Sequence, residues 1–427
     1  MPKTRTVVGW VALAMAGTAL ALLIVLNLTP AGRKVEHQIE HLYAVGDSQF
    51  TRSMGTLLGP SMLEGNEVTP LINGVEIFPA MLEAIRGARE TINFETYIYW
   101  SGEIGREFGE ALSERARAGV QVRLLIDWVG AGKMDDALIE GMEQAGVVVV
   151  KYHPLRWYTL ARLNNRTHRK LLVVDGRTGF TGGVGIADNW QGNAEDPDHW
   201  RDSHFRIRGP AVAQMQAAFM DNWMETQARV LHDEAFFPDL DPAGPHFAQV
   251  LQSSSAGGSE SVRLMYLLSI AAAVRSIRLA NAYFVPDSLS VAMLVAAQRR
   301  GVRVGIIVPG RHIDAKVVRA ASRSRWGPLL EAGIAIYEYQ PTMYHTKMMI
   351  VDDAWVSVGS TNFDSRSFRL NDEANLNVLD AEFAGGQAKV FEQDKARSRR
   401  ISLAVWQARP WQEKIKERLA GLVRAQL

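Results

Sequence analysis

The sequence predicts an α/β protein made of two pseudo-symmetric halves that share one site, behind an N-terminal hydrophobic helix. Three observations support this fold class. A His-Lys-Asp triplet occurs twice at one spacing, a helix–strand–helix–Gly–strand order occurs in both halves, and a long uncharged run precedes them. Because the repeated strands are nearly continuous apolar runs, we expect a sheet covered by helices on both faces.

The N-terminal run is VVGWVALAMAGTALALLIVL, residues 7–26, without a charge. At 1.5 Å rise per residue it extends about 30 Å, enough to cross the hydrocarbon core of a bilayer. A cleaved signal peptide and a buried helix are the alternatives, but the run is longer than a usual signal core and no clean small-x-small site follows it. We predict a retained single-pass anchor over about 7–28. A slight excess of positive charge before the run favours an inside N-terminus.

The two halves are visible when the chain is compared with itself. In the first, FPAMLEAIRGARETINFETYIYW leads to EALSERARAGVQVRLLIDWVG; in the second, RLMYLLSIAAAVRSIRLANAYFVPD leads to AMLVAAQRRGVRVGIIVPG. We therefore predict an anchor and lead-in segment over 1–64, a first domain over 65–240 and a second domain over 260–427. The stretch 241–259 is rich in Pro, Gly and Ser and is predicted to be an inter-domain linker.

The chain ends in a predicted helix that begins near Pro410. Trp411, Ile415, Leu419 and Leu422 fall along one side of it, with charges opposite. We interpret this side as the face that packs on the second domain, with a membrane-surface helix as the alternative.

Composition excludes several kinds of site. The chain has 427 residues, a formal net charge of +1 and no cysteine. The absence of cysteine excludes disulfides, cysteine-ligated zinc and thiol catalysis. The near-neutral balance argues against a nucleic-acid partner, which more often meets a basic excess.

The repeated triplet is the main functional signal. Its two copies are His168, Lys170 and Asp175, and His345, Lys347 and Asp352. Residues two apart on a strand share a face, so each His and Lys project together, while each Asp stands at the strand end, where a structural role is expected. A small-residue pair follows each Asp by seven positions and includes Gly183 in the first copy and Ser360 in the second. One copy alone would indicate a core histidine; two copies predict a shared site.

Two histidines and two lysines in one pocket suit a phosphate diester. One histidine can attack phosphorus while the other protonates the departing alcohol. Lysines and backbone amides of the small residues can hold the charge of the phosphoryl oxygens. We therefore expect neither a metal nor another cofactor.

The pattern HxKxxxxD, found twice with GG or GSxN downstream, resembles the phospholipase D superfamily. Within it, EVTPLINGVEIFPAMLEAIRGARETINFETYIYW, HWRDSHFRIRGPAVAQMQAAFMDNW and VGSTNFDSRSFRLNDEANL are similar to segments of bacterial cardiolipin synthases. The resemblance covers most of the chain after the hydrophobic run. It implies two phospholipase D-like α/β/α domains with the active site at their interface.

The resemblance also implies residue roles. His168 is expected to be the nucleophile that forms a phosphohistidine, and His345 the acid and then the base. Lys170, Lys347 and Asn362 are expected to bind phosphate, and the carboxylates that orient the histidines are expected to be Glu373 and Asp202. The first repeat departs from the pattern, because Gly185 stands where the second has Asn362. This departure implies an asymmetric site.

The function implied is a phosphatidyltransferase of the bacterial inner membrane. It would make cardiolipin from phosphatidylglycerol and a second phospholipid such as phosphatidylethanolamine, with a slight preference for a catalytic part outside. A phospholipase D hydrolase, a nuclease of the same superfamily and a non-catalytic lipid-binding scaffold are the alternatives. Trp157 and Tyr158, before the first triplet, are candidates for a membrane contact. The oligomeric state is left open.

Overall fold

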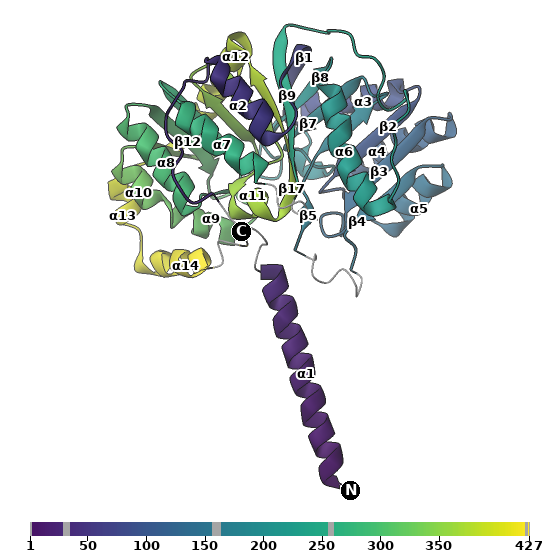
Figure 1. Ribbon diagram of the computed structural model, residues 1–427, viewed down its shortest axis with the longest axis horizontal. Helices are drawn as coiled ribbons and strands as arrows, with labels where there is room; N and C mark the ends of the chain where they lie inside the picture. Colours follow the sequence, from purple (N-terminus) through teal and green to yellow (C-terminus); the bar gives the residue numbers. More distant parts are fainter. Residues whose placement is uncertain (1, 29–34, 156–163, 255–259, 423–425, 427) are drawn as a thin grey trace.

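The computed structural model describes residues 2–28, 35–155, 164–254, 260–422 and 426. It forms a broad α/β body in which helices flank a continuous sheet, with one long helix projecting away from it (Figure 1). The predicted membrane contact at Trp157 and Tyr158 lies outside the described residues.

The projecting helix is α1, Pro2–Leu28, which contains the predicted hydrophobic run. Side chains are described only for its residues 8–22, so both ends of the run lie outside the described side chains. Searched over the described residues, the chain has no helix whose length and hydropathy together suffice to cross a membrane.

Sixteen strands of the described chain form one mixed sheet with the same order in each half. From the outer edge to the centre, the first half contributes β4 (Val148–Tyr152), β3 (Gln121–Asp127), β2 (Thr91–Thr96), β6 (Leu171–Val174), β7 (Thr178–Gly182), β8 (Ser203–Arg208) and β1 (Leu63–Ile72). The second contributes β18 (Ser398–Ile401), β13 (Ala335–Tyr339), β12 (Arg303–Pro309), β10 (Ser276–Asn281), β14 (Lys347–Val351), β15 (Trp355–Gly359), β17 (Asn371–Leu379) and β9 (His246–Ser253). Strand β5 (Arg166–Thr167) pairs with β17, and β11 (Phe284–Val285) pairs with β16 (Phe363–Asp364).

The helices connect and cover these strands. Those of the first half are α3 (Asn73–Gly87), α4 (Glu103–Arg117), α5 (Asp136–Gln144), the short η2 (Asp188–Trp190) and α6 (Val212–Gln227). Those packed with the second half are α2 (Ser48–Leu58), α7 (Ser261–Ala272), α8 (Ser288–Arg299), α9 (Lys316–Arg323), α10 (Trp326–Glu331), α11 (Ser365–Arg369), α12 (Ala381–Ala396), α13 (Leu403–Gln407) and α14 (Trp411–Leu422).

The predicted repeat is confirmed. In the first half α3, β2, α4 and β3 follow one another, and in the second half α7, β10, α8 and β12 do the same. Gly119 and Gly301 each join a helix to its strand at φ of +93° and +96°, a left-handed conformation that a side chain would strain. The same turn in both copies lets each strand lie parallel to the one before it.

The halves are joined by more than the sheet. A central core combines residues of both, including Val173 and Ile207 from the first half and Ile350 and Leu376 from the second. In the lead-in segment, α2 packs into the core of the second half, where the Phe50 ring lies 4.9 Å from the ring of Trp355.

The predicted linker over 241–259 contains an ordered strand where the structure describes it. Residues 246–253 form β9, which pairs with β1 on one side and β17 on the other. Phe247, Ala248, Val250 and Leu251 form a short apolar run interrupted only by Gln249, a strand signal that the neighbouring Pro, Gly and Ser residues hid. The domain boundaries themselves stay predictions.

Candidate active site

Each predicted histidine stands just before a central strand, at a place where the two halves touch. His168 follows β5, which runs parallel to β17 of the other half, and its N–H donates to the Asp372 carbonyl at 2.9 Å. His345 precedes β14, and its N–H donates to the Arg201 carbonyl of the first half at 2.8 Å. The backbone of one half therefore fixes the histidine of the other.

Each histidine also contacts a carboxylate that belongs to the opposite half. Nδ1 of His168, in the first half, lies 3.0 Å from both carboxylate oxygens of Glu373 in β17. Nδ1 of His345, in the second half, lies 2.7 Å from Asp202, the residue before β8. A carboxylate at Nδ1 holds the proton there and leaves the Nε2 lone pair for chemistry. The sequence-based roles of Glu373 and Asp202 agree with this geometry.

The two carboxylates are buried and held by further donors. Ser360 Oγ donates to Glu373 at 2.5 Å, and Trp190 Nε1 donates to Asp202 at 3.0 Å. Gly183 matters for its size, since a Cβ there would stand 2.2 Å from Asp202 Oδ1. Ser360 therefore contacts Glu373, and Gly183 leaves the room that Asp202 occupies, which favours the orienting rather than the phosphate-binding role predicted for them.

The lysines lie beneath the histidines. Lys170 Nζ donates to the His168 carbonyl at 2.8 Å, and Lys347 Nζ to the His345 carbonyl at 2.6 Å. Lys347 Nζ also lies 3.1 Å from the His345 ring nitrogens. Both ammonium groups are nearly fully buried, a costly arrangement for fixed charge that suits an anionic ligand.

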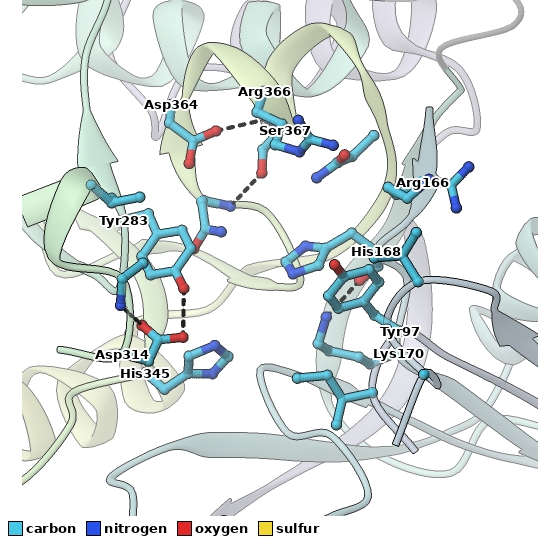
Figure 2. Close-up of a pocket in the computed structure, with 18 of the residues that line it drawn as sticks. Tyr97, Arg166, His168, Lys170, Tyr283, Asp314, His345, Asp364, Arg366 and Ser367 are labelled. Atoms are coloured by element: carbon cyan, nitrogen blue, oxygen red, sulfur yellow. Dashed lines mark hydrogen bonds between the residues drawn. The ribbon is translucent and has the colours of Figure 1, made fainter. Parts of the chain in front are cut away.

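One cavity of about 500 Å³ is lined by both histidines, whereas Lys347 and the two carboxylates lie behind its wall. His168 and His345 enter it from opposite sides, and Lys170 and Asn362 also line it (Figure 2). The Asn362 side-chain oxygen, a hydrogen-bond acceptor, is buried with no hydrogen-bond partner among the described atoms. The asymmetry at Gly185 has a steric cause, because a Cβ there would stand 2.8 Å from Ile98 Cβ.

Asp175 and Asp352 lie at turns away from the cavity. Asp352 accepts from the backbone N–H groups of Val274, Arg275 and Ser276 at 2.6–2.8 Å, and Asp175 accepts from the corresponding residues before β2. Their geometry supports a structural role.

We expect Asp352→Ala to destabilise the protein by about 3 kcal/mol or more, because three backbone donors lose a charged acceptor. The change should appear as a lower Tm, with kcat of the remaining folded enzyme unchanged. Asp353→Asn is the matched control, since Asp353 makes a partly exposed ion pair with Arg278 whose loss should cost about 1 kcal/mol at most. Loss of kcat at unchanged Tm would contradict the structural role.

The pKa shifts of the two histidines favour neutral imidazoles. Burial lowers the pKa of His168 to about 4, although Glu373 partly offsets it. Burial and the Lys347 charge lower the pKa of His345, while Asp202 raises it. A neutral His168 can attack at neutral pH. His345 can gain its proton when a bound phosphate neutralises Lys347.

The lysines predict an alkaline limit. Burial lowers the pKa of Lys170 to about 7 and that of Lys347 to about 8. Each lysine is charged below its pKa, so kcat/KM should fall as pH rises through about 7 to 8. Because bound phosphate favours the charged lysines, kcat should fall at a higher pH than kcat/KM. Lys347→Met should lower kcat by about 10²–10³-fold. Lys347→Arg, which stays charged, should remove the part of the fall near pH 8 and leave the part near pH 7 that Lys170 sets. A pH profile unchanged in Lys347→Arg would contradict this.

Sequence reasoning missed a pair of tyrosines on the cavity wall. Tyr97 follows β2 and Tyr283 follows β10, one near each histidine in Figure 2. The Tyr97 ring centre is 5.3 Å from that of His168, and the Tyr283 hydroxyl donates to Asp314 at 2.7 Å. Aligning NFETY with LANAY in the internal repeat could have found both. Asp364, Arg166 and Arg366 also line the cavity, without a comparable signal in the sequence.

Comparison with known proteins identifies the family of this chain. Residues 81–223 and 266–395 match the family model "Cardiolipin synthase, PLD-like domain". The cardiolipin synthase of Geobacillus thermodenitrificans is 36% identical over 84% of this chain and 72% of its own length. The major cardiolipin synthase of Bacillus subtilis is 34% identical over 84% and 75%. A crystal structure of phosphatidylserine synthase from Haemophilus influenzae shares the fold at 16% identity, with a TM-score of 0.67 over 89% of this chain and 99% of that one. The chain therefore belongs to the family of phospholipase D-like cardiolipin synthases.

Proposed function

We propose that this chain is a cardiolipin synthase that transfers a phosphatidyl group from a donor phospholipid, phosphatidylglycerol or phosphatidylethanolamine, to the glycerol end of a phosphatidylglycerol acceptor. The observation that carries the proposal is the pair of histidines facing one cavity, each oriented by a buried carboxylate of the opposite half. Two-step transfer needs one such imidazole for each of two jobs. The relatives that are named cardiolipin synthases align with most of this chain.

In the first step Nε2 of His168 attacks phosphorus of the donor. The bond from phosphorus to the leaving alcohol oxygen breaks, and that oxygen takes a proton from His345. The products are free alcohol (glycerol, when phosphatidylglycerol is the donor) and a phosphatidyl–His168 intermediate. Lys170, Lys347 and Asn362 hold the non-bridging oxygens, whose charge is spread in the transition state.

In the second step a hydroxyl of the acceptor lipid attacks the same phosphorus. His345, now neutral, takes the hydroxyl proton as the new P–O bond forms, and the P–N bond to His168 breaks. Cardiolipin leaves, and both histidines return to their starting state. Water in place of the acceptor would give phosphatidic acid by the same route, so the acceptor decides between transfer and hydrolysis. That no metal or cofactor takes part stays a prediction.

The test is product analysis on full-length purified protein. Phosphatidylglycerol vesicles, with and without phosphatidylethanolamine and without added metal, should give cardiolipin, and glycerol or ethanolamine identifies the donor. His168→Ala should give none, whereas His232→Ala, an exposed histidine away from the cavity, should behave as wild type. Phosphatidic acid alone would make the protein a hydrolase. No lipid turnover with cleavage of single-stranded DNA would make it a nuclease.

The proposed location is a bacterial inner membrane, with α1 as the attachment. Its described side chains are exposed, among them Trp10, Leu13 and Leu20. A single pass with the catalytic part outside stays a prediction from the sequence. Placing charge in the helix with Leu13→Glu and Leu20→Glu should release the protein from membranes in alkaline carbonate. Full retention of this variant would assign the attachment to another element.

A further inference from the structure

Helix α14 is oriented with its apolar side toward solvent. Four large apolar side chains occupy one stripe of this helix and are 67, 46, 60 and 79% exposed: Trp411, Ile415, Leu419 and Leu422. The opposite side carries Glu417 and Ala420, both buried. A helix that covers a globular core has the reverse arrangement. The expectation that this stripe packs on the domain is therefore wrong.

Polar contacts hold the helix in this orientation. The Glu417 carboxylate lies 2.7 Å from Arg409 Nη2 and 3.3 Å from Arg323 Nε. Ala420 packs in a small apolar cluster with Val318 and Ala321 of α9. Because the buried ion pairs fix the rotation of α14 about its axis, the outward stripe is a property of the folded domain.

Basic side chains border the stripe. At 3.6 residues per turn, Arg418 and Lys414 follow one edge of the stripe, and Lys416 lies beyond the other. All three are exposed. An apolar strip between basic side chains complements a bilayer surface that contains anionic lipid, with the apolar groups in the acyl region and the cations at the headgroups.

The helix lies beside the active site. It packs on α9, whose Val317 is 48% exposed and lines the catalytic cavity, and Gln426, just beyond the helix, lines the same cavity. In Figure 1, α14 lies on the lower side of the body, the side from which α1 projects, and it runs crosswise to α1. An interfacial helix has this relation to a helix that enters a membrane.

We infer that α14 is a membrane-docking helix: its stripe inserts into the surface of an anionic lipid bilayer and sets the catalytic cavity at that surface. The inference rests on the proposed function, because it supplies the way in which a lipid reaches the two histidines. Large exposed apolar groups gathered in one place, unlike scattered ones, mark such contact surfaces.

The absence of cysteine from the chain allows a site-specific test. A single Leu419→Cys in the full chain carries an environment-sensitive fluorophore, and the protein is added to phosphatidylglycerol vesicles that contain doxyl-labelled lipid. Leu57→Cys is the matched control, since Leu57 is 62% exposed on α2, away from α14 in Figure 1. The label at 419 should be quenched by lipid and shielded from aqueous iodide, and the label at 57 should show the reverse. The effect at 419 should weaken as phosphatidylcholine replaces phosphatidylglycerol and as salt is raised.

Two outcomes would overturn the inference. A label at 419 open to iodide on vesicles would leave the stripe in water, and shielding from both quenchers would indicate contact with a second copy. As a functional arm, Ile415→Ser with Leu419→Ser should lower turnover of vesicle lipid by about tenfold, without changing turnover of short-chain monomeric lipid. Docking without any turnover would reject the proposed function alone, and turnover without docking would reject this inference alone.

Discussion

His168→Ala should remove phosphatidyl transfer almost completely, by about 10⁶-fold in kcat, because the atom that bonds to phosphorus is lost. His345→Ala should cost about 10²–10⁴-fold, the usual contribution of an acid or base. The two rings are equivalent in burial and in carboxylate contact, so the difference tests the assignment of roles rather than a difference in packing.

A donor with a good leaving group separates the roles. When the leaving group is p-nitrophenolate, which departs without a proton, His345→Ala should regain its first step and release a burst of one p-nitrophenolate per enzyme. His168→Ala should release none, and His232→Ala should match wild type. The reverse pattern would exchange the two roles. Equal losses on both substrates would show that neither histidine acts as a dedicated acid.

Glu373→Gln and Asp202→Asn should each lower kcat by about 10⁴-fold, the effect of giving a catalytic imidazole the wrong tautomer. Because each histidine is oriented by a carboxylate of the other half, each carboxylate variant should behave like the alanine variant of the histidine that it orients. Asp202→Asn should be restored by the p-nitrophenyl donor, as His345→Ala is. Glu373→Gln should not be.

A pH profile distinguishes this effect from simple loss of stability. Glu373 raises the pKa of His168, so removing its charge should move the acid limb set by His168 to still lower pH. Glu225→Gln is the matched control, since Glu225 lies 3.0 Å from Nε2 of the buried His153 outside the cavity. It should lower Tm without a change in the pH profile. An unchanged acid limb in Glu373→Gln would contradict the assignment.

The sequence was sufficient for the parts of this protein that repeat locally. The two triplets, their strands and the helix–strand order needed only neighbouring residues, whose periodicity follows from backbone geometry. The exchange of Glu373 and Asp202 could not be predicted in this way. The contact of Glu373 with His168 depends on β5 pairing with β17, two segments about 200 residues apart, and that of Asp202 with His345 depends on the bridge between Arg201 and Tyr344. The sequence carries no local signal for either pairing.

The misjudged elements have a common physical cause. Segment 241–259 was classified by the Pro, Gly and Ser residues around β9, although its pairing partners decide its structure. Helix α14 was classified by its apolar stripe, although the ion pairs of Glu417 decide which side turns inward. The composition of a segment is known from its own residues, but the side that it buries also depends on the residues that contact it from elsewhere in the chain.

The packing of α2 into the second half also sets the order of events during synthesis. Phe50 leaves the ribosome 305 residues before its ring partner Trp355, a delay of about 15 to 60 s at ordinary rates of translation. Helix α7, which also packs against α2, and both strands that pair with β1 are made earlier than Trp355. The apolar face of α2 is therefore covered in stages, and its burial is complete only when β15 appears.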